Sequence, residues 1–381
     1  MDIGAFLVKL LQGGAGNLAA YLAAHVLLCL LPAFFIAGGM SALIPKESVT
    51  RFLGRNAPKF ISYPAAALAG SVLAVCSCTI VPLFAGIYKK GAGLGPAITF
   101  LFFAPAANIL ALAYTGVAIG PDLAFARLFL SLAFGIGIGL IMALIFSRAD
   151  RQHDQANDES FNGNRSMRPG MVIFLLLLVA LLIAGTLKVD LFTNTYARLT
   201  LPITGMDQFQ NWLYQLVPFD ASKGEEGVTA QGATLIGLLL LIGLSAWKGF
   251  EKVFEGFNGW LWTSLGLIVL TLITAAFKMT PLPTGLELGV TGRAIGVGVL
   301  ILAAALVVRY QFTKDELRDW LWETWRFVKQ IFPLLIFGVF AVGMIRQLIR
   351  PEWIESLAGQ NTLLGNLAGV VFGVFMYFPT L

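Results

Sequence analysis

Two cysteines separated by one residue, Cys76 and Cys78, are the side chains of this chain best suited to chemistry. Thiolates bind soft cations and thiophilic centres. On a regular helix, positions i and i+2 lie about 200° apart, so both thiols reach one ligand only where the backbone turns or unwinds. Pro82 favours such a break because it removes a helical N–H. Cys76 and Cys78 are therefore candidate thiol ligands; the alternative is that they are small buried hydrophobes.

The stretch 71–110 around these cysteines is apolar, but helix breakers interrupt it. Pro82, Pro96 and Pro105 each lack an N–H, which frees the carbonyl four residues earlier, and glycines cluster before the second of them. Freed carbonyls at membrane depth are tolerated where protein or a wet cavity covers them. Interrupted helices indicate the binding site of a transporter, although ordinary proline kinks produce the same pattern. We therefore place Thr79, Pro82 and Pro105 in a candidate substrate site with the cysteines.

Three further polar side chains lie inside apolar segments. His25 and Cys29 are spaced i, i+4, so a helix places them on one face. A histidine at membrane depth is a functional candidate, and the alternative is a core histidine with satisfied hydrogen bonds. Asn108 follows Pro105 by three residues and needs hydrogen-bond partners on other helices or on a substrate. His25, Cys29 and Asn108 complete the candidate substrate site.

Other kinds of site are not indicated by the sequence. No Asp or Glu lies within 61–118, so this part offers no carboxylate relay for protons. All 3 cysteines lie in apolar spans, which argues against a disulfide framework. We find no nucleotide motif and no pair of haem ligands. We therefore expect no cofactor, no enzyme activity, and no metal site beyond the candidate thiol ligands Cys76 and Cys78.

The composition predicts an integral membrane protein. Hydrophobic residues make up 57% of the 381 positions and charged residues 12%, whereas soluble domains carry roughly 25% charged residues. Charges fall between continuous apolar runs of about 20 residues, the length of a membrane-crossing helix. A barrel would show short alternating segments instead. The expected fold is an all-α polytopic helix bundle. The net charge of +5 comes from loops, which indicates topology and no nucleic-acid partner.

About ten apolar spans are expected, and some of them are broken or re-entrant in the region of the cysteines. The bilayer is thus the first partner of the chain, which we expect to be a multi-pass protein of the bacterial cytoplasmic membrane. The predicted spans lie near 19–44, 61–88, 93–118, 121–147, 170–187, 233–247, 258–277, 293–309, 327–349 and 363–379.

Polar segments divide these spans into larger parts. The segment 148–169 has no apolar periodicity and is predicted to be a flexible cytoplasmic linker. The mixed segment 188–232 is predicted to form an ordered excursion at the membrane surface. The segment 310–326 carries three tryptophans among charges, which is typical of an interfacial helix. The predicted parts are a first membrane half 1–147 with the Cys-x-Cys core, the linker 148–169, middle spans 170–309, and the interfacial helix with a second repeat, 310–381.

A weak internal repeat relates the two ends of the chain. Gly39-Met40, Leu53-Gly54-Arg55-Asn56 and Gly70 recur as Gly343-Met344, Ala358-Gly359-Gln360-Asn361 and Gly373. Transporters often carry such repeats, with the substrate site where the copies meet. The second copy stops at Leu381, the point that corresponds to the start of the Cys-x-Cys stretch in the first copy. Membrane proteins seldom end inside a span, so we expect the encoded chain to continue.

The motifs in this stretch resemble a known family. CSCTIVPLFAGI and KKGAGLGPAITFLFFAPAANILAL resemble the signature of the predicted permease family that includes exporters of trivalent methylated arsenicals. The pattern matches at Cys76 to Leu83, Gly91 to Ala97 and Pro105 to Asn108, and the segment after residue 350 looks like the family's second half. The resemblance implies a membrane permease. For arsenical-exporting members it implies a thiophilic substrate met by cysteines, here Cys76 and Cys78.

The leading hypothesis is a permease that moves a small molecule or metalloid across the membrane, by efflux of a trivalent methylated arsenical or another thiophilic compound. One alternative is a membrane thiol oxidoreductase in which Cys76 and Cys78 cycle through a disulfide, although a Cys-x-Cys ring is strained. Another is a channel-like or assembly component without thiol chemistry.

Overall fold

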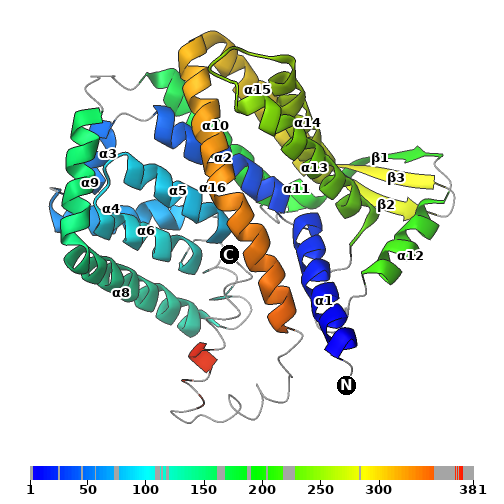
Figure 1. The fold of residues 1–381 in the computed structure, drawn as a ribbon, viewed down its shortest axis with the longest axis horizontal. Helices are drawn as coiled ribbons and strands as arrows, with labels where there is room; N and C mark the ends of the chain where they lie inside the picture. The colour runs from blue at the N-terminus through cyan, green and yellow to red at the C-terminus, as the bar shows by residue number, and fades with distance from the viewer. Residues whose placement is uncertain are drawn as a thin grey trace.

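Apolar helices form most of the fold, as the continuous apolar runs of the sequence predict (Figure 1). The computed structural model describes residues 3–24, 26–43, 46–55, 57–72, 77–107, 112, 115–116, 120–160, 168–186, 190–202, 205–217, 228–282, 285–346, 365, 367 and 369–371.

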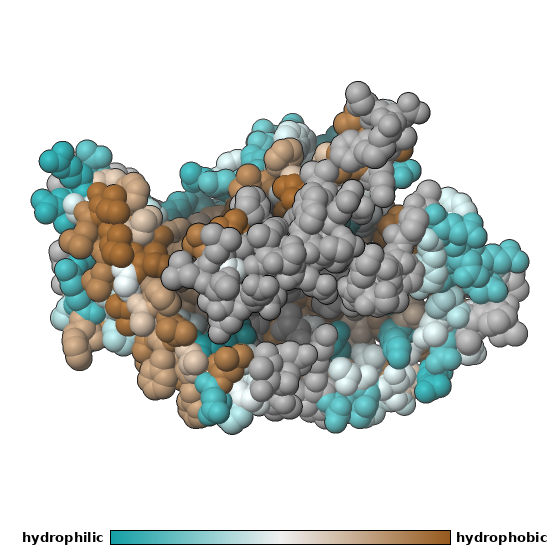
Figure 2. Space-filling view, turned by 90° about the horizontal axis from the view of Figure 1, so that it is seen from below, coloured by the Kyte–Doolittle hydropathy of each residue, from teal (hydrophilic) through white to brown (hydrophobic). Residues whose placement is uncertain are grey.

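Within these residues, 5 helices are long and apolar enough to cross a membrane, which confirms a helical, multi-pass membrane protein. Side chains on their outer faces are apolar, and Figure 2 shows hydrophobic side chains gathered on the side of the molecule where α8 lies. The total of about ten spans and the internal repeat stay predictions. The five helices are α8 (Pro121–Ile145), α13 (Ala230–Phe250), α14 (Gly259–Ala276), α15 (Gly292–Gln311) and α16 (Lys314–Arg346).

The remaining helices are shorter or more polar. The predicted span 19–44 falls on α1 and α2, and the predicted span 61–88 falls on α4 and α5. These helices are α1 (Ile3–Ala24), α2 (Val26–Leu43), α3 (Lys46–Leu53), α4 (Lys59–Val72), α5 (Ser77–Lys89), α6 (Leu94–Ala106), α9 (Ser147–Ser160), α10 (Pro169–Thr186), α11 (Asp190–Thr193) and α12 (Met206–Leu216).

A small antiparallel sheet corrects the expectation of an all-α fold. Strands β1 (Thr195–Leu201), β2 (Lys278–Leu282) and β3 (Gly285–Thr291) pair in the order β1-β3-β2 beside the helices (Figure 1). β1 belongs to the predicted surface excursion 188–232, and the β2–β3 hairpin joins α14 to α15. The hairpin was missed because its strands are only 5 and 7 residues long and lie between long apolar runs. The described residues of this segment also include α12.

The polar segment 148–169 also differs from the prediction of a flexible linker. Its first part forms α9, which follows α8 almost directly. The side of α9 that carries Asp150 packs on the protein, and Asp150 is 4% exposed. Hydropathy analysis overlooks such a helix because a polar helix held by side-chain contacts has no apolar stripe. Residues 161–167 lie outside the described residues.

The tryptophans of the segment 310–326 do not lie on a separate helix, because residues 314–326 form the first part of α16. Trp320 and Trp325 are buried, and each indole N–H donates inside the protein. Trp320 donates to the Phe35 carbonyl over 2.9 Å, and Trp325 donates to Glu251 over 2.9 Å. These two side chains therefore hold α16 to other helices and do not serve as membrane anchors.

A close helix contact of the core joins α2 to α16. A Cβ on Gly38 would lie 2.7 Å from the Thr324 amide nitrogen and 2.8 Å from its Cα, so only a glycine permits this approach. The neighbouring Trp320 ring packs against Phe35 and Phe174. Small residues at such positions let helix backbones approach closely where lipid supplies no hydrophobic driving force.

Replacing Gly38 by Ala is expected to lower the melting temperature of the purified protein, because the added methyl forces α2 and α16 apart at a cost of about 1–3 kcal/mol. Gly137→Ala in α8 is the matched control, since a Cβ there meets nothing within 4 Å. It gains helix propensity without a clash. Thermal unfolding in detergent measures both, and equal melting temperatures for the two variants would contradict the close α2–α16 approach.

Candidate functional site

The stretch predicted to be broken contains short separate helices. α5 and α6 have 13 residues each, which is about 20 Å of helix against a hydrocarbon core of about 30 Å. α4 ends at Val72 and α5 begins at Ser77. The first turn of α5 therefore contains Cys78 and Thr79, and Pro82 follows within the same helix. Neither α5 nor α6 is long enough to cross the membrane alone.

The eight candidate site residues differ in how far the structure describes them. Pro105 is half-buried in the last turn of α6. The backbones of four others are placed, without a description of their side chains: Cys29 in α2, and Cys78, Thr79 and Pro82 in α5. His25, Cys76 and Asn108 lie outside the described residues.

The helices that carry these residues are neighbours. α5 lies between α2 and α6 (Figure 1). α2 and α5 approach closely at Gly86, where a Cβ would lie 3.2 Å from the Ala37 carbonyl oxygen. The fold thus brings the backbones of Cys29, Cys78 and Pro105 onto three adjacent helices. The grouping of these positions in one site remains a prediction.

A tight turn connects α5 to α6. Gly91 has a φ of 90°, a conformation that side chains with a Cβ rarely adopt. The Gly93 N–H donates to the Leu53 carbonyl over 2.7 Å, and Ala92 forms an isolated bridge with Gly54. The turn is therefore paired with the end of α3, and Gly91 permits its backbone conformation.

Two prolines of this stretch have different structural roles from those predicted. Pro96 is the third residue of α6, where an N–H has no intrahelical partner, so it begins the helix rather than breaking it. Pro105 lies in the last turn, and α6 ends one residue later. The breaks in this segment thus come at the ends of α6 and not within it.

Charged side chains from the next two helices satisfy the ends of α6. The Leu94 N–H donates to Asp150 Oδ1 of α9 over 3.1 Å, and Arg127 Nε of α8 donates to the Ala106 carbonyl over 2.6 Å. A carboxylate at the N-terminus and a guanidinium at the C-terminus match the helix dipole at both ends. Sequence reasoning missed both residues, because Asp150 lies in the polar segment and Arg127 at the start of an apolar span.

An acidic residue on α16 joins α5 and α2. Glu323 Oε2 accepts from Lys89 Nζ over 2.5 Å and from Ser41 Oγ over 3.2 Å, and Arg326 lies 3.9 Å from its other oxygen. The Glu323 side chain is only 16% exposed. A partly buried carboxylate of this kind needs its cationic partner. Lys89 is the last residue of α5, so this pair attaches the C-terminus of the cysteine-bearing helix to α16.

Reversing the charge in Glu323→Lys is expected to destabilise the fold by about 1–3 kcal/mol, because two ammonium groups would meet in a partly buried site. The double variant Lys89→Glu/Glu323→Lys restores opposite charges and should recover part of the loss. Thermal unfolding of the singles and the double gives the coupling between the two positions. Asp315→Lys is the control, because the Asp315 side chain in the first turn of α16 is 84% exposed. Strictly additive effects at positions 89 and 323 would contradict the pairing.

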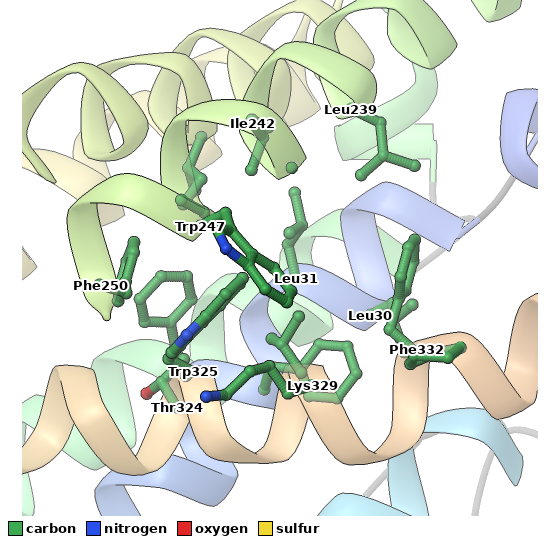
Figure 3. Close-up of a pocket in the computed structure, with 17 residues that line it drawn as sticks. Leu30, Leu31, Leu239, Ile242, Trp247, Phe250, Thr324, Trp325, Lys329 and Phe332 are labelled. Carbon is green, nitrogen blue, oxygen red and sulfur yellow. The ribbon is translucent and has the colours of Figure 1, made fainter. Parts of the chain in front are cut away.

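An apolar cavity of about 470 Å³ lies on the other side of α16. Four helices form its walls, and Figure 3 shows its few polar groups at one end, where Lys329 and Thr324 lie beside Trp325. Leu30, Leu239 and Phe332 line the opposite end. The lining residues come from α2 (Leu30, Leu31, Phe34, Phe35), α13 (Leu239, Ile242, Gly243, Ala246, Trp247, Phe250), α14 (Ile268) and α16 (Thr324, Trp325, Val328, Lys329, Phe332, Pro333).

Glu251, directly after α13, holds the polar end of this cavity together. Its two oxygens accept from Lys329 Nζ over 3.1 and 2.9 Å, and one also accepts from Trp325 Nε1. The hydrogen bonds from Lys329 and then from Trp325 lower the pKa of the Glu251 carboxyl below its ordinary value. The ionised carboxylate is therefore favoured in the folded protein.

The lowered pKa makes a prediction about pH. A carboxyl whose folded-state pKa is depressed stabilises the fold above its unfolded-state pKa, and that contribution is lost as the pH falls through the folded-state value. At neutral pH the wild-type protein should therefore have a higher melting temperature than Glu251→Gln. The difference between the two melting temperatures should shrink as the pH is lowered towards about 4. Glu255→Gln, in the same turn but 73% exposed, should behave as wild type. If the difference in melting temperature grew on acidification, the assigned direction of the Glu251 pKa shift would be wrong.

No group of three or more His, Cys, Asp or Glu side chains gathers as a metal site within the part of the chain that the structure describes. The polar groups of the region instead serve helix ends and helix contacts. Comparison with known proteins identifies the family to which this chain belongs.

The model of a family described as predicted permease matches residues 12–381. UPF0718 protein MJ0584 of Methanocaldococcus jannaschii is 31% identical over 382 residues, which cover 100% of this chain and 80% of that protein. UPF0718 protein YcgR of Bacillus subtilis is 29% identical over 113 residues, 29% of this chain and 38% of that protein. No solved structure matches the chain. The chain therefore belongs to the predicted permease family, which agrees with its apolar membrane-spanning helices.

Proposed function

We propose that this permease exports a small thiophilic solute across the cytoplasmic membrane, and that trivalent methylated arsenicals are the substrate class. The observation that carries the proposal is the position of Cys78, the second described residue of α5, on a helix that packs against both α2 and α6. Broken helices of this kind build substrate sites in transporters because their ends direct unpaired backbone groups at the solute.

The start of α5 suits a thiolate. The first N–H groups of a helix have no intrahelical partner, and the dipole is positive at this end. Thiolates are the ligands that soft, thiophilic centres prefer. In the proposed site Cys76 and Cys78 bind the solute, and Thr79, Asn108, His25 and Cys29 line the path together with Pro82 of α5 and Pro105 at the end of α6.

Movement of the site requires one group of helices to shift against another. α5 is attached to α16 through Lys89 and Glu323, while α6 is attached to α8 and α9 through Arg127 and Asp150. The α5–α6 turn is the joint between these two attachments. Alternating access is proposed to open and close the cysteine-bearing end of α5 by motion at this joint.

Growth of a bacterial strain that lacks its own arsenical exporters tests the proposal. Expression of the protein should raise resistance to trivalent methylarsenicals and lower their accumulation in the cell. The double variant Cys76→Ser/Cys78→Ser should lose this resistance, because a serine hydroxyl does not replace a thiolate as a soft ligand. Ser77→Ala, which keeps both cysteines, is the matched control and should retain it.

Immunoblots of the membrane fraction establish that all variants are expressed to the same level. Unchanged resistance with good expression of the wild type would reject the arsenical substrate. Full export by the double serine variant would reject the role of the thiols. Thiol trapping in cells distinguishes the permease from the oxidoreductase alternative. The oxidoreductase requires a mixed population of reduced and oxidised Cys76 and Cys78.

A further inference from the structure

The apolar cavity between α2, α13, α14 and α16 opens toward the lipid-facing surface of the molecule. Gly243 and Trp247 of α13 line the cavity and are also exposed, Trp247 to 64%. Leu240 and Leu244 beside them are exposed as well. Leu30 and Phe34 of α2 form the back wall and are 2% exposed. The cavity is thus a recess that leads from the outer surface of α13 to the core.

The long direction of the recess follows α13 inward from the membrane interface. α13 ends at Phe250, and the turn after it carries Glu251, Lys252 and Glu255, which places this end at the polar boundary. Leu239 lines the opposite end and precedes Phe250 by 11 positions, about 16 Å of helix. The recess therefore runs from the headgroup level into the hydrocarbon region, as an acyl chain does.

The chemistry of the lining selects an apolar occupant. Apolar cavities stay dry, and an empty one loses dispersion contacts on all its walls. In a bilayer the molecules that reach an opening on α13 are lipids. The charged groups at the mouth, Lys329 and Glu251, are paired with each other, so no net charge there selects a headgroup.

We propose that the recess is a lipid site that binds one acyl chain of a membrane phospholipid, with its headgroup at the level of Glu251. The chain packs between Trp325 and Trp247 near the interface and against Leu30, Phe34 and Phe332 farther in. Among the described residues that line it, none is a candidate substrate-site residue. The proposal does not rest on the proposed transport function.

Two glycines of α13 supply a matched pair of variants. A Cβ on Gly243 or on Gly237 meets nothing within 4 Å, and both positions are exposed. Only Gly243 lines the recess. Gly243→Leu therefore fills the opening, whereas Gly237→Leu adds the same side chain to the same helix outside it. Both changes raise helix propensity, so neither is expected to unfold α13.

The experiment uses the full chain reconstituted in vesicles that contain phosphatidylglycerol with a photoreactive diazirine in the middle of one acyl chain. After illumination, mass spectrometry locates the label. Wild type should carry label on the segment 30–35 of α2, which lipids surrounding the protein do not reach. Gly243→Leu should reduce labelling of this segment about tenfold, since it displaces two or more methylenes of the bound chain. Gly237→Leu should leave it unchanged.

The same labelling with a phosphatidylcholine probe tests the role of the headgroup, and equal labelling of the segment 30–35 is expected. Label confined to the exposed outer face of α13 would overturn the proposal, as would equal losses in Gly243→Leu and Gly237→Leu. A strong preference for one headgroup would overturn the assignment of recognition to the acyl chain. Unchanged elution and melting of both variants establish that the losses do not come from unfolding.

Discussion

The need to pair every backbone N–H and C=O inside an apolar environment governs the cysteine-bearing half of this protein. A helix that crosses the bilayer brings its ends to water, but α5 and α6 are too short to do so. Their ends must be satisfied by protein. Asp150 and Arg127 do this for α6, and the end of α3 does it for the turn between the two helices. The polar residues of α8 and α9 are thus structural requirements of a broken helix.

The same requirement explains why acidic residues join distant parts of the chain. Glu323 connects α16 to α2 and α5, and Glu251 connects the end of α13 to α16. In each case the carboxylate accepts hydrogen bonds from more than one donor, which keeps its desolvation tolerable. α16 takes part in both contacts and in the close glycine contact with α2. It is the helix around which the described part of the fold is organised.

Much of the fold was predictable from local sequence, because a continuous apolar run allows only a helix in lipid. The separation of α5 from α6 was also predictable, from Gly91 and Gly93 between the two apolar runs. The β2–β3 hairpin and α9 were not, because short strands and polar helices have weak periodic patterns and depend on distant partners. Trp320 and Trp325 resembled interfacial anchors, and only their partners Phe35 and Glu251 show that they are buried contacts.

For the candidate site, the sequence proposed a segment but not the residues that support its helices. The structure places Cys78 in the first described turn of α5, and the role of the cysteines stays a prediction. The residues that hold this region, Lys89, Asp150 and Glu323, were not identified because each pairs with a residue far along the chain. A pairing over 234 positions, such as Lys89 with Glu323, has no local signature in a single sequence.

The support of α6 by later residues has a consequence for biosynthesis. Leu94 is made 56 positions before its acceptor Asp150, and Ala106 is made 21 positions before its donor Arg127. Until those residues emerge from the ribosome, both ends of α6 have unpaired polar groups that hydrocarbon does not accommodate. We expect α6 to remain in the translocon and to enter the bilayer only together with α8. The broken helix is thus inserted as half of a pair, and its release into lipid depends on sequence that has not yet been translated when α6 is complete.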